Sequence, residues 1–116
     1  MKKLLSIFLL AVLAVSVYAM ALPDPPTNYQ AVLDYPTFTT ISFTNGNGAV
    51  TVRHELSTDG GVTWSRLDDD IVPTTTSDHS LPTNCVCYLR AKSVNGSGSS
   101  AYTPEIVVVT GDYDPE

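Results

Sequence analysis

Apolar and polar residues alternate over much of the chain beyond residue 26, which is the pattern of strands that are buried on one face. Val50, Val52, His54 and Leu56 show it clearly, and no stretch in this part repeats its apolar residues every 3.6 positions as an amphipathic helix does. The pattern predicts seven strands, at residues 27–33, 37–44, 49–58, 62–67, 71–81, 85–94 and 102–110. Short strands separated by turns favour an all-β fold, a seven-stranded antiparallel β-sandwich.

Four segments predict the connections between these strands. Asp59-Gly60-Gly61 lies between two alternating segments and predicts a hairpin, because glycine takes the positive φ that tight turns need. Asn45-Gly46-Asn47-Gly48 predicts another turn, and the Gly/Ser-rich residues 95–100 predict a flexible loop. Asp68-Asp69-Asp70 predicts a solvated bend after the fourth strand.

The N-terminal residues 1–21 have the features of a secretory signal peptide: two lysines, a leucine- and alanine-rich run, and small residues at the end. The small residues fit cleavage after Ala19 or after Ala21. The apolar run is also close to the shortest length that spans a membrane, so a retained anchor is the alternative. We expect one domain over 22–111 and a short tail over 112–116.

The charge balance is acidic, with 12 carboxylates against six cations. Cleavage of the signal peptide removes two of the cations and leaves Arg53, Arg66, Arg90 and Lys92. Nucleic acids and anionic membrane surfaces are bound by clustered lysine and arginine. The composition therefore argues against both partners, and membrane contact is expected only through a retained anchor.

Several segments resemble the fibronectin type III family. They are the proline-rich residues 23–26, Ile41-Ser42-Phe43, the stretch from Arg53 to Gly61, and above all Leu89-Arg90-Ala91-Lys92-Ser93-Val94-Asn95-Gly96. The resemblance covers nearly all of the chain after the signal peptide. It implies an immunoglobulin-like sandwich of seven strands.

Three positions depart from the family's pattern. Phe43 stands where the family usually has tryptophan, and His54 stands where it has an inward valine. Cys87 replaces a tyrosine whose hydroxyl ties the corner between the fifth and sixth strands. The resemblance implies that this tie is missing unless the neighbouring Tyr88 supplies it.

The central hairpin also resembles the Asp-box of sialidase-like propellers. The match is carried by Ser57, Asp59, Gly61, Thr63 and Trp64. A propeller needs several blades of about 40 residues, for which this chain has no room. In that family the box is a folding element away from the catalytic site. We therefore expect a structural hairpin that the Trp64 ring covers.

The two cysteines, Cys85 and Cys87, lie two residues apart on one predicted strand, near the outer limit of disulfide reach. The leading expectation is two small buried side chains on the core face. The alternatives are a strained or intermolecular disulfide, which a secreted environment permits, and a metal site with His54 and His79. The spacing is not that of a zinc finger, so no metal or other cofactor is expected.

No group of residues predicts catalysis. A nucleophile needs a base and an orienting group that converge in a pocket, whereas Cys87 and His54 are expected to face the core. Catalytic carboxylates usually converge from different elements, but those of Asp68, Asp69 and Asp70 are adjacent and point apart. We therefore expect a protein that is not an enzyme.

The expected function is a secreted or cell-surface module for binding, adhesion or spacing, with a protein or a glycan as its partner. A rigid sandwich presents its loops, so the candidate ligand residues are Asn45, Asn47, Asn95, Ser97 and Ser99. Asn95-Gly96-Ser97 is also a glycosylation sequon. The alternative is a structural subunit of an extracellular fibre, sheath or coat. Its copies would form a homo-oligomer by pairing edge strands such as 106–109.

Overall fold

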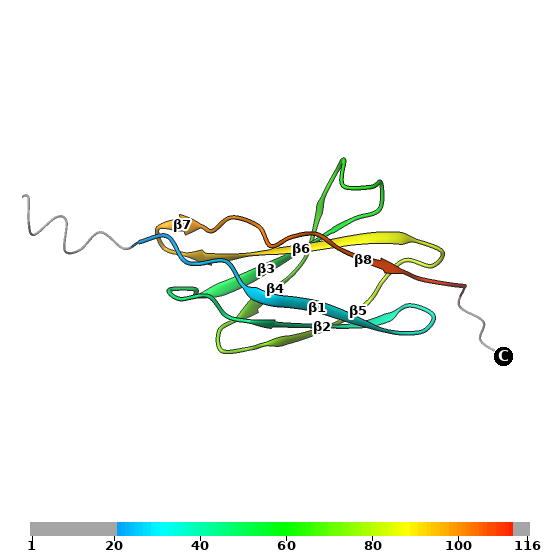
Figure 1. Ribbon diagram of the computed structural model, residues 1–116, viewed down its shortest axis with the longest axis horizontal. Coiled ribbons are helices and arrows are strands. Elements are labelled where there is room, and N and C mark those ends of the chain that lie inside the picture. The colour runs from blue at the N-terminus through cyan, green and yellow to red at the C-terminus, as the bar shows by residue number, and fades with distance from the viewer. Residues whose placement is uncertain (1–20, 113–116) are drawn as a thin grey trace, which may run out of the picture.

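The computed structural model describes residues 21–112 and contains eight strands and no helix in this range (Figure 1). The strands are β1 (Thr27–Asp34), β2 (Phe38–Thr44), β3 (Thr51–Ser57), β4 (Ser65–Ile71), β5 (Thr76–Ser80), β6 (Val86–Asn95), β7 (Gly98–Ser99) and β8 (Ile106–Val109). Most of the expected signal peptide and tail lies outside the described residues. Among residues 21–112, no helix is long and apolar enough to cross a membrane.

Two antiparallel sheets pack face to face, as expected from the alternation. One sheet has three strands in the order β1-β2-β5. The other has the order β4-β3-β6, and both β7 and β8 pair with β6 on its remaining side. The all-β sandwich is therefore confirmed. Its eighth strand is the two-residue β7, which lies in the segment predicted as a flexible loop.

The fourth strand differs most from the prediction. The bend expected at Asp68, Asp69 and Asp70 is wrong, because all three residues lie inside β4 and pair with β3. Basic partners explain why consecutive acids are tolerated there: Asp69 forms ion pairs with Arg53 on β3 and with Arg66 on its own strand. The strand also begins later than predicted, since residues 62–63 belong to the preceding hairpin turn.

The fifth and last strands are shorter than predicted. Of the expected 71–81 segment, residue 71 ends β4 and only residues 76–80 form the fifth strand, after a turn that contains the cis peptide bond Val72–Pro73. Only residues 106–109 of the expected 102–110 segment pair with β6. Pro104 lies just before this pairing begins, and proline cannot donate a ladder hydrogen bond.

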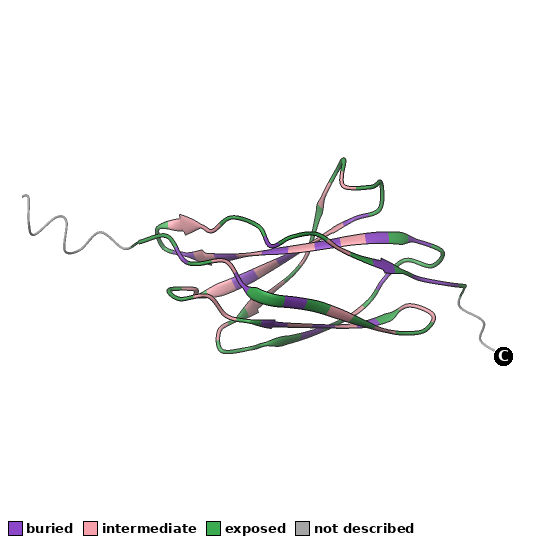
Figure 2. Ribbon diagram, viewed as in Figure 1, coloured by how far each residue is buried: buried purple, intermediate pink, exposed green. Residues whose placement is uncertain are grey.

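The core lies between the two sheets and follows the predicted alternation. Along β6, every second residue is buried and the residues between them are partly exposed or exposed, which Figure 2 shows as alternating purple and pink bands. Ile41, Val52, Leu89 and Ala91 are fully buried. Burial of such side chains is worth about 1.5–3 kcal/mol each for the larger ones, so the centre of the sandwich supplies most of its cohesion.

Candidate functional site

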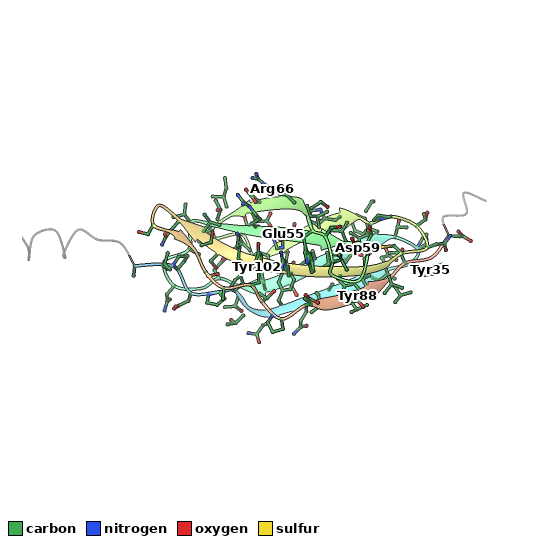
Figure 3. The ribbon with its side chains drawn as sticks, turned by 90° about the horizontal axis from the view of Figure 1, so that it is seen from above. Tyr35, Glu55, Asp59, Arg66, Tyr88 and Tyr102 are labelled. Carbon is green, nitrogen blue, oxygen red and sulfur yellow. A yellow bond between two sulfur atoms is a disulfide. The ribbon has the colours of Figure 1, made fainter. Side chains whose placement is uncertain are left out.

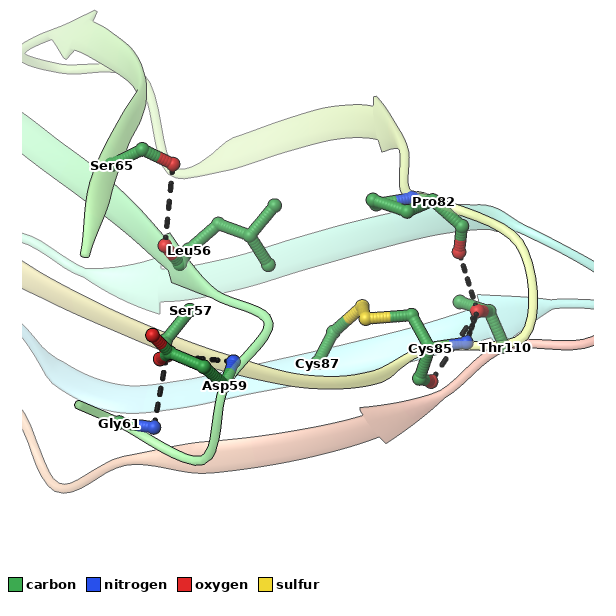
Figure 4. The surroundings of a disulfide bond; sticks show 9 residues. All are labelled: Leu56, Ser57, Asp59, Gly61, Ser65, Pro82, Cys85, Cys87 and Thr110. Carbon is green, nitrogen blue, oxygen red and sulfur yellow. Dashed lines mark hydrogen bonds between the residues drawn. A yellow bond between two sulfur atoms is a disulfide. The ribbon is translucent and has the colours of Figure 1, made fainter. Parts of the chain in front are cut away.

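The central hairpin is held by its own side chains. The Ser57 hydroxyl accepts the Gly61 N–H at 2.9 Å and donates to Asp59 Oδ1 at 2.7 Å. Asp59 in turn accepts the N–H groups of Val62 and Thr63 at 3.1 and 2.9 Å, and the Thr63 hydroxyl (Figure 4 shows the Ser57–Asp59–Gly61 part). These bonds, led by that of the Thr63 hydroxyl, hold the pKa of Asp59 down at about 2. The Asp-box geometry thus closes a turn.

Beside this hairpin, alternating aromatic and charged side chains stack on the outer face of the larger sheet. We call this set the aromatic ladder, and its members are Glu55, Trp64, Arg90, Lys92 and Tyr102. The Arg90 guanidinium lies 4.1 Å from the ring centroid of Trp64 and 3.7 Å from that of Tyr102. The Lys92 ammonium is 5.0 Å from the Tyr102 ring. Such cation–π contacts fix the rings in one orientation.

Glu55 joins two members of the aromatic ladder by hydrogen bonds. One oxygen accepts the Arg90 side chain at 2.8–2.9 Å, and the other accepts the Tyr102 hydroxyl at 3.0 Å. Figure 3 shows Glu55 and Tyr102 close together along the outer face. Trp64 donates its indole N–H to the Gly61 carbonyl at 3.1 Å, which joins the ladder to the hairpin.

The sequence prediction did not identify the aromatic ladder, although it named Trp64. One signal was present: Glu55 on β3 and Arg90 on β6 are opposite charges on outward positions, and the two residues are direct register partners. Tyr102 could not be found in this way. It lies in the irregular segment between β7 and β8, whose path no pattern predicts.

The loops expected to carry a ligand lie together at one end of the sandwich, but the side-chain amides of Asn45 and Asn95 are used within the protein. Asn95 donates to the carbonyls of Ala21 and Gly48 at 3.0 and 3.1 Å and is only 9 % exposed. Asn45 donates to the Thr74 carbonyl at 3.1 Å.

The other three candidate residues of these loops also take part in structure. The backbone carbonyl of Asn47 accepts the Asp24 N–H at 2.9 Å. Ser99 pairs with Val94 in β7, and the Ser97 N–H donates to the Asn95 side chain at 2.8 Å. The loops therefore clamp the proline-rich lead-in. The sequon asparagine lies inside that clamp, where it already uses its amide hydrogens.

A row of three hydrogen-bonded side chains, Tyr29, His54 and Asp70, crosses the core between the sheets. His54 is fully buried, with Nδ1 2.8 Å from the Tyr29 hydroxyl and Nε2 2.8 Å from Asp70 Oδ2. These partners assign the tautomer: Nε2–H donates to the carboxylate, and the Tyr29 hydroxyl donates to Nδ1. Burial lowers the pKa of His54 below its usual value and outweighs the opposing effect of its hydrogen bond to Asp70.

This Tyr–His–Asp chain superficially resembles a nucleophile–base–acid triad. However, burial and the charge of Asp70 raise the pKa of the Tyr29 hydroxyl, which is the reverse of what activates a nucleophile. The ring of His54 also packs on Tyr29, Phe43 and His79, with centroids 5.2–6.3 Å away. The Tyr29–His54–Asp70 geometry is therefore that of a buried polar network whose members satisfy each other's hydrogen bonds.

The two cysteines form a disulfide, and their Cα atoms are 5.3 Å apart. The leading expectation of two free buried thiols is therefore wrong. Cys85 and Cys87 are both buried on the core face, as predicted, and Figure 4 shows the bond between their sulfur atoms. The bond takes both sulfurs out of reach of a metal ion and of an intermolecular disulfide.

No protein-family model and no curated protein matches the sequence. Many solved structures match its fold. FN3tt superposes with a TM-score of 0.67 at 17 % identity, over 79 % of this chain and 98 % of that one. A Fn3-like protein from Clostridium thermocellum gives 0.67 at 19 % identity, over 81 % and 99 %. The chain has the fibronectin type III fold. A β-1,2-glucanase from Parabacteroides distasonis matches at 0.69 and 14 % identity, with 83 % of this chain covering 14 % of that one.

In this fold, the residue that ties the corner before β6 is Thr110. Its hydroxyl accepts the Cys85 N–H at 2.9 Å and donates to the Pro82 carbonyl at 2.5 Å (Figure 4). Tyr88 lies on the outer face, opposite Ser57 and Val107 in the register. The corner where fibronectin type III proteins usually have a tyrosine is thus closed by Thr110, which directly follows β8, rather than by Tyr88.

Proposed function

We propose that this fibronectin type III domain is a secreted or cell-surface module that binds a protein or glycan partner and spaces it from its attachment. The spacing part is supported by the course of the chain (Figure 1). Asn95 holds Ala21 at one end, and the Gly111 N–H donates to Pro36 at the other, at 3.0 Å. The described chain therefore begins and ends at opposite tips of the sandwich.

The binding part rests on one observation, the aromatic ladder on the open face of the larger sheet. Tryptophan, tyrosine and arginine are the side chains that most often dominate binding energy in protein interfaces. Here Trp64, Arg90 and Tyr102 are already fixed by stacking, so little side-chain freedom is lost on binding. The side-chain amides of the loop residues Asn45 and Asn95, in contrast, are engaged within the protein.

Position-specific photo-cross-linking in the producing cells tests this proposal. A photoreactive phenylalanine analogue at Tyr102 is expected to give an adduct with a partner, whereas the same analogue at the loop residue Asn47 gives none. An adduct only from Asn47 would return the binding site to the loops. No adduct from either position, with the protein recovered at its monomer mass, would contradict a binding role.

A second candidate function is a subunit of an extracellular fibre, sheath or coat. It is favoured by β8, an edge strand whose Val107 and Val109 are more than half exposed. The same experiment distinguishes it, because cross-links between two copies of this chain would replace those to a different partner.

Secretion leads to a prediction about processing. The Asn95 side chain donates a hydrogen bond to the Ala21 carbonyl at 3.0 Å. Cleavage after Ala19 keeps this hydrogen bond, whereas cleavage after Ala21 removes its acceptor. We expect the mature chain to begin at Met20. Intact mass and N-terminal sequencing of the secreted protein would show this. A chain that begins at Leu22, or that keeps residues 1–19, would contradict it.

A further inference from the structure

One edge of the larger sheet offers unpaired backbone groups. The Thr110 N–H donates to the Cys85 carbonyl at 2.9 Å, and the register pairs Cys87 with Val108. In an antiparallel pair, alternate residues turn their N–H and C=O groups toward the partner strand. Those of Val107 and Val109 therefore point away from β6, and among residues 21–112 no second strand pairs with β8.

The side chains around this edge form an apolar surface without charge. Val107 and Val109 are 53 % and 62 % exposed, and Val86, beside them on β6, is 52 % exposed. Tyr88 lies next to Val107 in the register and continues the surface toward the hairpin. Val108, between the two exposed valines of β8, is buried in the core.

The other outer strands carry the features that normally prevent added pairing. In β4, Arg66 and three consecutive aspartates place charges on the edge. In β1, the register shifts near its start and Asn28 has φ of 53°. β5 carries the charged Asp78 at its centre. β8 alone among these four strands is uncharged throughout, and it has neither proline nor a shift in register.

A hollow of about 300 Å³ adjoins the start of β8. It opens between the beginning of β1, at Asn28 and Tyr29, and the segment that leads into β8, at Pro104 and Ile106. Its lining is mostly apolar. A chain that runs along the free edge of β8 would pass this hollow, which has room for an apolar side chain.

We propose that β8 binds an extended segment of a partner protein as an added antiparallel strand. The segment is β-branched and apolar at alternate positions, and lysine or arginine flanks it. Alternation matches the outward valines, and the cations match Glu105 and Asp112, which precede and follow β8. This inference rests on the proposed binding function and names the chemistry of its partner.

Charge also argues that the added strand is not a second copy of this chain. The four cations among residues 21–112 already have partners in the same chain: Arg53 and Arg66 with Asp69, Arg90 with Glu55, and Lys92 with the Tyr102 ring. Pairing two β8 strands would bring two sets of acidic flanks together without a free cation between them. A partner with basic flanks meets no such repulsion.

Amide hydrogen exchange on the isotopically labelled secreted protein tests the proposal. The probe is a short synthetic peptide of alternating valine and threonine with a lysine at each end. In the free protein, the amides of Val107 and Val109 are expected to exchange fast and that of Val108 slowly. A peptide concentration ten times its dissociation constant should slow Val107 and Val109 by about tenfold.

Two control peptides and two protein variants separate the outcomes. Proline at the centre of the peptide should abolish the protection, and glutamate at both ends should weaken it. Val107→Lys in β8 should abolish it too, whereas Val32→Lys, at an exposed strand position of the opposite sheet, should leave it unchanged.

Absence of protection, or equal protection by the proline peptide, would overturn the added strand. If Tyr102 still gave cross-links in that case, the binding function itself would stand. Protection that rises with protein concentration alone would show that a second copy occupies β8, and would overturn the assignment to a basic partner.

Discussion

Replacing Gly46 with alanine is expected to lower the free energy of unfolding by about 1–3 kcal/mol or more. An added Cβ there would overlap the backbone of the lead-in, including the Asp24 carbonyl, whose carbon would lie 2.6 Å away, and the Pro25 oxygen, which would lie 2.8 Å away. Backbone atoms cannot rotate aside as a side chain can. Moving them would break the 2.9 Å bond from the Asp24 N–H to the Asn47 carbonyl.

Gly96→Ala is the matched control, because Gly96 also follows an asparagine in a turn but has no atom within 4 Å of its added Cβ. We expect that variant to stay within about 0.5 kcal/mol of the parent. Urea unfolding followed by the fluorescence of Trp64, the single tryptophan, measures both. Equal unfolding midpoints for the two variants would show that the lead-in is not packed against Gly46.

Replacing His54 with alanine is expected to destabilise the domain by about 3–5 kcal/mol. The substitution removes a fully buried ring and leaves the Tyr29 hydroxyl and an Asp70 oxygen without their partner. Tyr29→Phe removes only one bond and should cost about 1–3 kcal/mol, so it remains measurable if His54→Ala does not fold. Urea unfolding at neutral pH measures both variants. A loss under about 1 kcal/mol for His54→Ala would contradict the packed network.

The same histidine makes the parent protein's stability depend on pH. Because its pKa is lowered in the fold, the unfolded chain takes up a proton near pH 6.5 while the folded chain does not. Stability should therefore be complete above about pH 6.5 and fall as the pH drops below it. The corresponding loss for Asp59, whose pKa falls from 3.8 to about 2, comes only below about pH 4.

Unfolding curves between pH 5 and 7.5 isolate the contribution of His54. The decline should persist in a His79→Gln variant, since His79 is the only other histidine. It should vanish in any folded variant without His54. If the decline disappeared in the His79→Gln variant instead, the prediction for His54 would be contradicted.

The alternation of apolar and polar residues predicted the sandwich, because successive side chains of a strand point to opposite faces and only one face is buried. This is why Cys87, Leu89 and Ala91 were placed correctly in the core. The aspartates of β4 were placed wrongly because their strand is stabilised by partners on β3. Arg53 and His54 lie 16 residues before Asp69 and Asp70, and local composition carries no record of that pairing.

The candidate site was predictable only in part, for a similar reason. The Asp-box closes through residues at most four positions apart, so its motif could be read directly. The aromatic ladder joins Glu55 to Tyr102, 47 residues later. The loop asparagines were expected to face a ligand because they lie in turns, but Asn95 reaches back 74 residues to Ala21. Contacts of this range depend on the tertiary fold.

The attachment of the two chain ends at opposite tips also determines how the domain would respond to tension. A pull between Ala21 and Asp112 is directed along β1 and β8, whose ladder hydrogen bonds run across the strands. Such a force shears many bonds together instead of opening them one by one from an end. The hydrogen bonds of Asn95 to Ala21 and of Gly111 to Pro36 lie nearest the two ends, so they would bear the force first.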